Sequence, residues 1–367
     1  MPVWIAMVII FTASMLYKRR LGLYGRLFDS PVGRVGFGIV LFWVLTAILA
    51  DFIITQDPLS QVSGMKNKVP GTPVRGVEDA WYFLGGDNLA RDVFSRMVMG
   101  ARHVLSIAPA ATAFAFMVGI TLGLPAGYFG KRLDTSLSFL SNLVLAFPVI
   151  LLFYLLVTPE IRSTGIPIIM AGVLFLFPII FVVLLWQSRY YTQPTKRNLY
   201  VGITLILGLW VYSGLAFNSD PFGVFYMDPN LLNVFVSVVF VNSPTVFRIV
   251  RGITLDIQTR DYVAAAQTRG EGAWYIMLWE ILPNARGPLI VDFCLRIGYT
   301  TILLGTLGFF GLGVSPESPD WGSTINDGRK LLGIYPHPAL PPTLALMSLV
   351  LGLNMLADGL REESLKD

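Results

Sequence analysis

Long apolar segments separated by short polar ones recur along the whole of this 367-residue chain, and this alternation constrains the fold more than any other feature. About 20 apolar residues are enough for a helix to cross the hydrocarbon core of a bilayer. A backbone surrounded by lipid must satisfy its own hydrogen bonds, so such a chain folds as spanning helices. Hydrophobic residues make up 54% of the chain and charged residues only 14%, which excludes an ordinary soluble domain. The predicted fold class is an all-α polytopic membrane protein.

Nine apolar segments are predicted to span the membrane. The first, residues 1–17, is near the minimum length, and basic residues follow it rather than precede it, which argues against a cleaved signal peptide. The others are residues 35–55, 104–127, 135–157, 166–186, 199–217, 231–250, 288–311 and 339–357. Most lysines and arginines then fall on one face, as is typical of the cytoplasmic side, which places the N-terminus outside and the C-terminus inside.

Two of these segments carry packing signals. Gly119, Gly123 and Gly127 recur every four residues, a stripe that lets helix backbones approach closely in lipid. Pro148 lies inside the segment 135–157 and predicts a kink there.

A long polar segment, residues 56–103, is predicted to form an external loop. Near its end, Val93, Phe94, Met97 and Val98 have the spacing of a short amphipathic helix that could lie at the membrane surface. A solvated loop with one amphipathic turn is the alternative.

A polar, glycine-broken stretch between two apolar segments, residues 261–284, predicts a helical hairpin in the cytoplasm. Residues 262–269 are rich in alanine and favour a helix, which Gly270 should end. The side chains of Ala264, Ala265 and Ala266 predict a small flat face that a partner's backbone could approach closely.

The second arm of this hairpin is also predicted to be helical. An apolar stripe at helical spacing supports it, formed by Trp274, Met277, Leu278 and Ile281. We expect the helix to end at Leu282-Pro283, because a residue that precedes proline is disfavoured in the α region.

Several kinds of chemistry are excluded by composition. A single cysteine, Cys294, excludes a disulfide framework and a cysteine metal site, and two isolated histidines argue against a histidine metal site or a catalytic triad. The Gly130-Lys131 pair lacks the other residues of a nucleotide-binding P-loop. If ATP drives this protein, another chain binds it.

Asp292 and Arg296 are ionisable residues four apart within an apolar segment. Either charge alone would cost roughly 2.5 to 3.5 kcal/mol at the centre of a spanning helix, so the two are expected to pair. The pair could serve as a proton or ion relay, or it could be structural.

The hairpin resembles the cytoplasmic coupling loop of the permeases of binding-protein-dependent ABC importers. That loop reads Glu-Ala-Ala, three residues, glycine, about nine residues and Ile-x-Leu-Pro; this chain has Ala264-Ala265-Ala266, Gly270 and Ile281-Leu282-Pro283. Four further stretches resemble the oligopeptide and dipeptide branch of that family, and its second permease component in particular. They are residues 84–96, 127–134 with 146–148, 310–322, and 354–361.

Three departures from the family pattern stand out. Ala264 occupies the position of the usual glutamate, whose role Asp261 or Glu271 could take over, and Gly86 and Ala90 replace a threonine and a glycine of the external motif. The six-span plan of the family also lacks an equivalent of the first segment and of the pair 166–217. An inserted pair of spans leaves the hairpin on the same side of the membrane.

The resemblance implies the following division. Residues 1–34 are an extra N-terminal helix with a basic cytoplasmic segment, and residues 35–103 are the first core helix with the external loop. Residues 104–360 are the permease domain, with an inserted helix pair at about 158–230 and the coupling loop at 256–286. Residues 361–367 are a cytoplasmic tail.

The resemblance also implies a function, which is import of a small solute, with a di- or oligopeptide favoured, across the bacterial inner membrane. The implied partners are a second permease, two ATPase subunits that bind the ATP, an extracytoplasmic solute-binding protein and membrane lipid, but no nucleic acid. Asp261, Tyr262, Ala264 to Ala266 and Gly270 would dock the ATPase, and Pro283 would fix the exit of the hairpin. This subunit would have no catalytic residue, cofactor or metal of its own.

Three alternatives stay open at this point. The same machinery could import an oligosaccharide, an opine or a metal chelate, because nothing in the spans identifies the solute or the residues that line its path. An ion-coupled secondary carrier is more remote. A membrane enzyme lacks any nucleophile, metal cluster or paired carboxylates to support it.

Overall fold

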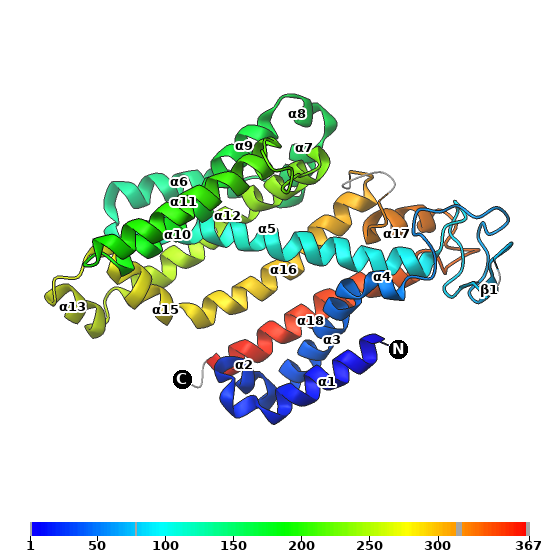
Figure 1. Cartoon of the computed structure of the whole chain (residues 1–367), viewed down its shortest axis with the longest axis horizontal. Coiled ribbons are helices and arrows are strands. Elements are labelled where there is room, and N and C mark those ends of the chain that lie inside the picture. Colours follow the sequence, from blue (N-terminus) through cyan, green and yellow to red (C-terminus); the bar gives the residue numbers. More distant parts are fainter. Residues whose placement is uncertain (1, 78, 313–317, 365–367) are drawn as a thin grey trace. The chain divides into compact units, whose positions relative to one another are not determined.

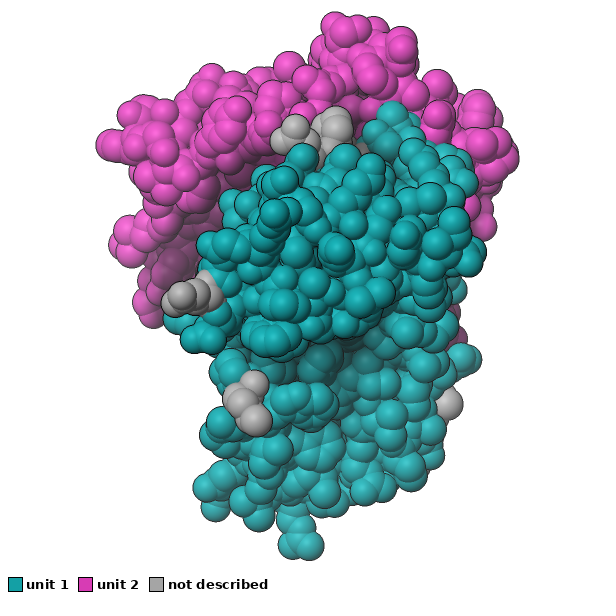
Figure 2. Space-filling model, turned by 90° about the vertical axis from the view of Figure 1, so that its right-hand side faces the viewer, with its two compact units in different colours: residues 1–109, 290–367 teal, residues 110–289 magenta. Residues whose placement is uncertain are grey.

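The computed structural model describes residues 2–77, 79–312 and 318–364. Its internal contacts divide the chain into two compact units, coloured separately in Figure 2. Unit 1 consists of residues 1–109 and 290–367, and unit 2 consists of residues 110–289. Each unit is described by itself below.

Unit 1 is built from helices of both chain ends (Figure 1). Its elements are α1 (Pro2–Leu16), α2 (Gly22–Arg26), α3 (Pro31–Ile48), α4 (Ala50–Ile53), β1 (Thr72–Pro73), β2 (Trp81–Tyr82), α17 (Trp321–Arg329) and α18 (Leu340–Ser364), with short 3-10 turns η1 (Lys18–Arg20) and η2 (Leu27–Asp29). Two long helices, α5 (Val93–Phe129) and α16 (Arg286–Phe309), begin in one unit and end in the other.

Unit 2 contains the predicted hairpin and the predicted inserted pair. Its elements are α6 (Lys131–Leu145), α7 (Val149–Val157), α8 (Pro159–Ser163), α9 (Ile166–Leu174), α10 (Leu176–Arg189), α11 (Pro194–Phe217), α12 (Pro229–Ile257), α13 (Asp261–Thr268), α14 (Ala273–Tyr275), the π-helical η3 (Ile276–Ile281) and α15 (Leu282–Asn284). The inserted pair consists of α9 with α10, followed by α11.

The all-α polytopic fold class is confirmed. Among the described residues, seven helices are long and apolar enough to cross a membrane, and the bent pair α6 and α7 would make an eighth. The first predicted span, α1, has 15 residues, or about 22 Å at 1.5 Å per residue, which is short of the hydrocarbon thickness of about 30 Å. A total of nine spans therefore stays a prediction.

The predicted kink at Pro148 is instead a break between two helices. Helix α6 ends at Leu145, and α7 begins at Val149 at an angle of 80° to it. Pro148 lies between them in an extended conformation, with φ −58° and ψ 120°. Because proline has no N–H to give to a preceding turn, the helix stops before it rather than bending around it.

The separate amphipathic helix predicted at the membrane surface is wrong, because Val93 begins the 37-residue helix α5. The carboxylate of Asp92 caps this helix by accepting hydrogen bonds from the backbone N–H groups of Phe94 (3.3 Å) and Ser95 (3.0 Å). Val98 is buried within unit 1, and the next predicted span continues the same helix without a break.

The segment between α4 and α5 is more than a solvated loop. Strands β1 and β2 pair antiparallel, and four side chains form a small core of their own: Met65, Val74, Tyr82 and Ala90. The hydroxyl of Tyr82 donates to the carbonyl of Ala90 at 3.0 Å, and burial raises the pKa of Tyr82 to about 12. The segment therefore has fixed structure.

The predicted glycine stripe packs α5 against α12 in unit 2. A Cβ atom added at Gly119 would lie 2.5 Å from Val246 Cγ1, and one at Gly127 would lie 2.7 Å from Thr254 Cβ. Gly123 is similarly close to Val250. The small residues thus let two spanning helices approach closely, as predicted.

Candidate functional site: the helical hairpin

The hairpin begins where α12 ends, and an ion pair fixes this end of α12. The guanidinium of Arg251 forms two hydrogen bonds with the carboxylate of Asp134 on α6, of which the one from Nη2 to Oδ2 is 2.6 Å long. Asp134 belongs to the motif at residues 127–134. Through Asp134, this motif holds α12, the helix that carries the hairpin.

The first arm of the hairpin, α13, presents a small exposed face. Tyr262, Ala264 and Ala265 are exposed, as is Asp261 at the start of the helix. Ala266 is fully buried, so its predicted place on the flat outer face is wrong. With about 3.6 residues per turn, Ala266 points away from Ala264, toward the second arm.

Gly270 ends the first arm as predicted. Its φ of +78° lies in the left-handed region, where residues with a Cβ are strained. Its N–H donates to the carbonyl of Gln267 at 2.9 Å, and the N–H of Glu271 donates to that of Ala266 at 3.2 Å. These two bonds close the helix and reverse the chain.

The second arm buries the predicted apolar stripe. Met277, Leu278 and Ile281 are buried, together with Ile276, and Trp274 is half-buried. These side chains form the inner face of the hairpin, against which Val263 and Ala266 of the first arm are also buried. Apolar packing therefore holds the two arms together.

The predicted end of the second arm at Leu282-Pro283 is wrong. Leu282 is helical, with φ −59° and ψ −42°, and the helix continues to Asn284. The six residues before Leu282 form a π-helical turn, which is wider than an α-helix. This wider turn gives the proline ring the room that an α-helix would deny it. Pro283 lies inside the helical arm, and the chain turns at Ala285.

One ion pair joins the polar edges of the two arms. Arg269 Nη2 lies 2.9 Å from Glu280 Oε1, and Arg269 Nε lies 4.0 Å from Glu271 Oε1. The side chain of Arg269 is 54% exposed, so the pair contributes at most about 1 kcal/mol. Of the two acids expected to replace the family's glutamate, Glu271 faces Arg269, and Asp261 lies exposed on the first arm.

The second arm also contacts the inserted pair at the end of α10. The indole N–H of Trp279 donates to Ser188 Oγ at 3.1 Å, and the guanidinium carbon of Arg189 lies 4.8 Å from the centre of the Trp279 ring. Sequence patterns could not predict this contact, because its two partners are 91 residues apart, in segments with no shared periodicity.

A groove of about 540 Å³ lies between the end of α12 and the hairpin. Tyr262 lines it, and the partial loss of solvent around the phenol raises the pKa of this side chain. The remaining lining residues are Gly252, Ile253, Asp256, Ile257, Arg260, Asn284 and Pro288. With its mixture of one phenol and charged and apolar groups, this groove suits a protein side chain.

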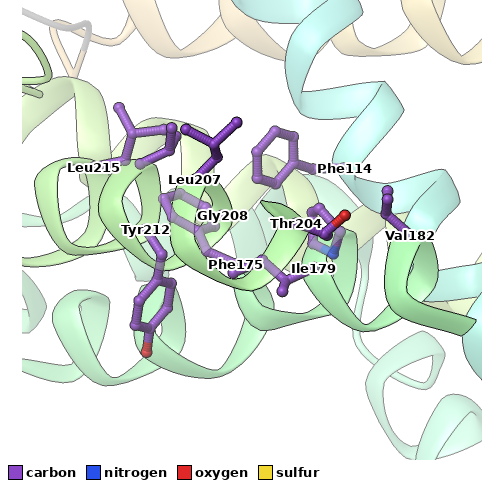
Figure 3. A pocket seen from close by; sticks show the side chains of 11 residues that line it. Phe114, Phe175, Ile179, Val182, Thr204, Leu207, Gly208, Tyr212 and Leu215 are labelled. Atoms are coloured by element: carbon purple, nitrogen blue, oxygen red, sulfur yellow. The ribbon is translucent and has the colours of Figure 1, made fainter. Parts of the chain in front are cut away.

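A cavity of about 330 Å³ lies between α5, α10 and α11 and is shown in Figure 3. Phe114, Phe175 and Leu207 are typical of its lining, which carries no charged side chain. The hydroxyls of Thr204 and Tyr212 both donate to backbone carbonyls, Tyr200 and Gly172 respectively. The cavity offers nothing to the charged ends of a peptide.

The intramembrane pair predicted in α16 is present. Arg296 Nε lies 2.6 Å from Asp292 Oδ2, and both side chains are largely buried in unit 1. The two charges compensate each other, as expected for residues four apart on a helix. A relay function for the pair stays a prediction.

The motif at residues 84–96 forms a buried ionic network in unit 1. Arg91 bridges Asp87, at 2.6 Å, and Asp327, at 2.9 Å. Arg96, which is fully buried, donates to Thr324 and to the carbonyl of Ser318. These contacts join the loop before α5 to α17 and the residues before it, so the motif is structural here.

The motif at residues 310–322 is only partly described, because Gly313 and Pro316 lie outside the described residues. Trp321, at its end, is fully buried and donates through its indole N–H to the carbonyl of Met97 at 2.8 Å. Within the described residues, no group of three or more histidine, cysteine, aspartate or glutamate side chains could hold a metal ion.

Comparison with known proteins places these features in context. Residues 199–362 match the family described as binding-protein-dependent transport system inner membrane component. The dipeptide transport system permease protein DppC of Alkalihalophilus pseudofirmus is 29% identical over 339 residues, covering 92% of this chain and 87% of that protein. The glutathione transport system permease protein GsiD of Pectobacterium atrosepticum is 30% identical over 281 residues, covering 77% and 71% respectively. The DppC protein of Haemophilus influenzae is 26% identical over 328 residues, covering 89% and 88%.

Proposed function

Because this chain belongs to the family of inner membrane components of binding-protein-dependent transport systems, we propose that residues 256–286 are the loop through which a separate ATPase drives transport. The chain is a multi-pass inner membrane transport subunit. It binds no cofactor of its own, and the ATP is bound by its partners. In the complex, it pairs with a second, related permease above two ATPase subunits, and an extracytoplasmic protein delivers the solute.

The observation that carries this proposal is the packing of the hairpin. Its two arms share one apolar inner face, so the hairpin is a compact body held covalently to α12 and α16. Ala264 and Ala265 are exposed on its outer face, where small side chains allow close approach of a partner. A cleft in the ATPase can therefore grip α13 without unfolding it.

The mechanism follows from the two covalent links. When the ATPase subunits close on ATP, the gripped hairpin moves and α12 and α16 move with it. The change in access is a shift between two populated states, driven by contacts that differ between them. Arg251 and Asp134 help transmit this motion, because they join the end of α12 to α6.

The proposed solute is a short peptide, as in the dipeptide and glutathione systems to which the chain is similar. The apolar lining in Figure 3 argues that the solute does not pass between α10 and α11. Binding of a di- and tripeptide panel to the cognate solute-binding protein tests the substrate class. Binding of an oligosaccharide, an opine or a metal chelate instead would contradict it.

The hinge of the hairpin is tested by a matched pair of proline substitutions. Gly270 has a φ of +78°, which proline cannot adopt, and its N–H is hydrogen-bonded. Gly272 has a φ of −68°, close to the value that proline fixes. Gly270→Pro should abolish uptake and solute-stimulated ATP hydrolysis without preventing membrane insertion, whereas Gly272→Pro should retain both. Equal transport by the two variants would refute the hinge.

The docking face is tested by side-chain size at Ala265. Its side chain is exposed, so Ala265→Trp leaves the hairpin core intact while blocking close approach of a partner. The variant should insert normally but lose co-purification of the ATPase and uptake, whereas Ala265→Ser should retain both. Normal uptake by Ala265→Trp would remove the docking proposal.

A further inference from the structure

We propose that the inserted helix pair braces the coupling hairpin, and that Trp279, Ser188 and Arg189 are positioning residues for energy coupling. The inference rests on the proposed function of the hairpin and assigns a task to the helices α10 and α11, for which the six-span plan has no equivalent. All of the contacts that carry it lie within unit 2.

The brace consists of two interactions with one side chain. Ser188 Oγ accepts the indole N–H of Trp279 at 3.1 Å and itself donates to the carbonyl of Leu185 at 3.1 Å. Arg189 lies over the same indole ring, 4.8 Å from its centre, at the distance of a cation–π interaction. An edge contact together with a face contact fixes the orientation of the ring as well as its position.

The end of α10 is itself held to α11. Trp186, Tyr190 and Tyr200 stack with ring centres 5.0 to 6.0 Å apart and planes 23° to 28° from parallel. The first two lie on α10 and the third on α11, so the stack ties both helices together next to Ser188. A contact made by Ser188 and Arg189 is therefore anchored in two spanning helices rather than one.

On the hairpin side, the same contact reaches the docking arm. Trp279 lies between Leu278, which is buried in the hairpin core, and Glu280, which pairs with Arg269 at the end of the first arm. Displacement of Trp279 is thus transmitted to α13 both through the core and through the ion pair. The brace thus attaches the second arm of the hairpin to the membrane domain, in addition to the two covalent ends and to the hydrogen bond that Gln267 of the first arm donates to the Tyr128 hydroxyl on α5 at 3.3 Å.

This attachment has a consequence for coupling. Without the brace, the second arm of a gripped hairpin could tilt without moving the spans by an equal amount. The brace suppresses this tilt, so that closure of the ATPase moves α12 and the inserted pair together. Loss of the brace should leave ATPase docking intact but reduce the solute transported for each ATP hydrolysed.

The test compares the same chemical change at the two ends of the inserted pair. Trp279→Phe removes the indole donor at the hairpin, and Trp210→Phe removes an indole that donates to Asp220 at 2.7 Å at the other end of α11. Both are assayed in the assembled transporter in proteoliposomes for ATP hydrolysis and uptake, and by amide hydrogen exchange of residues 273–284.

Trp279→Phe should raise exchange of residues 273–284 by about three- to tenfold, since it removes a hydrogen bond and weakens the cation–π contact. It should also increase the ATP consumed per solute, and Ser188→Ala and Arg189→Gln should do the same to a smaller extent. Arg189→Lys keeps the cation, so its exchange rate and its ATP consumption per solute should lie between those of the native protein and those of Arg189→Gln. Trp210→Phe should change neither quantity.

The brace is refuted if Trp279→Phe has native exchange and a native ATP-to-solute ratio, or if Trp210→Phe uncouples transport equally. Either outcome leaves the docking role of the hairpin standing as long as Gly270→Pro still abolishes uptake. If Gly270→Pro transports normally, the proposed function itself fails. The two failures are therefore distinguishable.

Discussion

Replacement of Gly119 by alanine is expected to force apart the two helices that position the hairpin. The added Cβ would lie 2.5 Å from Val246 Cγ1 and 2.9 Å from the backbone nitrogen of Phe247. Carbon atoms in favourable contact are about 3.5 to 4.0 Å apart, so relief requires a movement of about 1 Å. Rotation of Val246 cannot provide it, because the backbone of α12 is also in the way.

The expected magnitude is the difference between two effects. Overpacking of a tight interface costs about 1 to 3 kcal/mol. Alanine in place of glycine in a helix returns about 0.5 to 1 kcal/mol. The midpoints of these two ranges leave a fall of about 1 kcal/mol in the free energy of unfolding, and uptake should fall with it, since α12 carries the coupling hairpin.

The assay is reversible unfolding in mixed detergent micelles, with Gly202→Ala as the control. Gly202 lies in α11, and a Cβ there would meet no atom within 4 Å. The control should be as stable as the native protein or slightly more stable. Equal stability of the two variants would refute the reasoning about the α5–α12 interface.

Three further predictions concern the ionic groups. Asp87→Asn should lower stability by about 1.5 to 3 kcal/mol, because it removes the charged partner at 2.6 Å from the buried Arg91, which keeps only Asp327 among the described residues. Asp57→Asn, at an exposed carboxylate of the same loop, should cost little, and equal resistance of the two variants to proteolysis of residues 56–92 would contradict this. Arg269→Ala should lower stability by no more than about 1 kcal/mol, and a larger loss in chemical denaturation would show that the ion pair, rather than the apolar face, holds the arms together. Loss of solvent raises the pKa of Asp220, but hydrogen bonds donated by Phe225, Phe222, Trp210 and Val224 outweigh it and lower the pKa to about 2. The ionised carboxylate should therefore hold its loop in place above pH 4, and the loop should loosen as the pH falls through about 2. Amide chemical shifts of Phe222 and Phe225 that stay constant over that range would contradict the last prediction.

Local sequence signals predicted local features of the fold well. The left-handed conformation of Gly270 and the helix contact of the glycine stripe were predictable, because each follows from residues that are close together in the sequence. Asp292 and Arg296 pair because helical geometry places residues four apart on one face. The candidate hairpin and its apolar stripe were predictable for the same reason.

Features that depend on distant residues were not predictable in this way. The loop before α5 is ordered by Arg91 and Arg96, whose partners in and before α17 lie more than 200 residues away. The rule that a residue before proline leaves the helix failed at Leu282, because a π-helical turn makes room for Pro283. Burial of Ala266 follows from packing against the second arm, and an alanine-rich sequence alone does not reveal which face is covered.

The central claim is that α13 faces the cytoplasm and is gripped by an ATPase. It is tested most directly in cells with Ala265→Cys, in a Cys294→Ala background that removes the single native cysteine. The new thiol is labelled with maleimides, one of which crosses the membrane and carries a photoreactive group that cross-links to whatever protein lies against residue 265. Tyr226→Cys, at an exposed position in the loop between α11 and α12, is the control. The account predicts that Ala265→Cys cross-links to the ATPase subunit and resists a membrane-impermeant thiol reagent added outside, while Tyr226→Cys reacts with the reagent. Labelling of Ala265→Cys from outside, with no cross-link to a nucleotide-hydrolysing subunit, would contradict it.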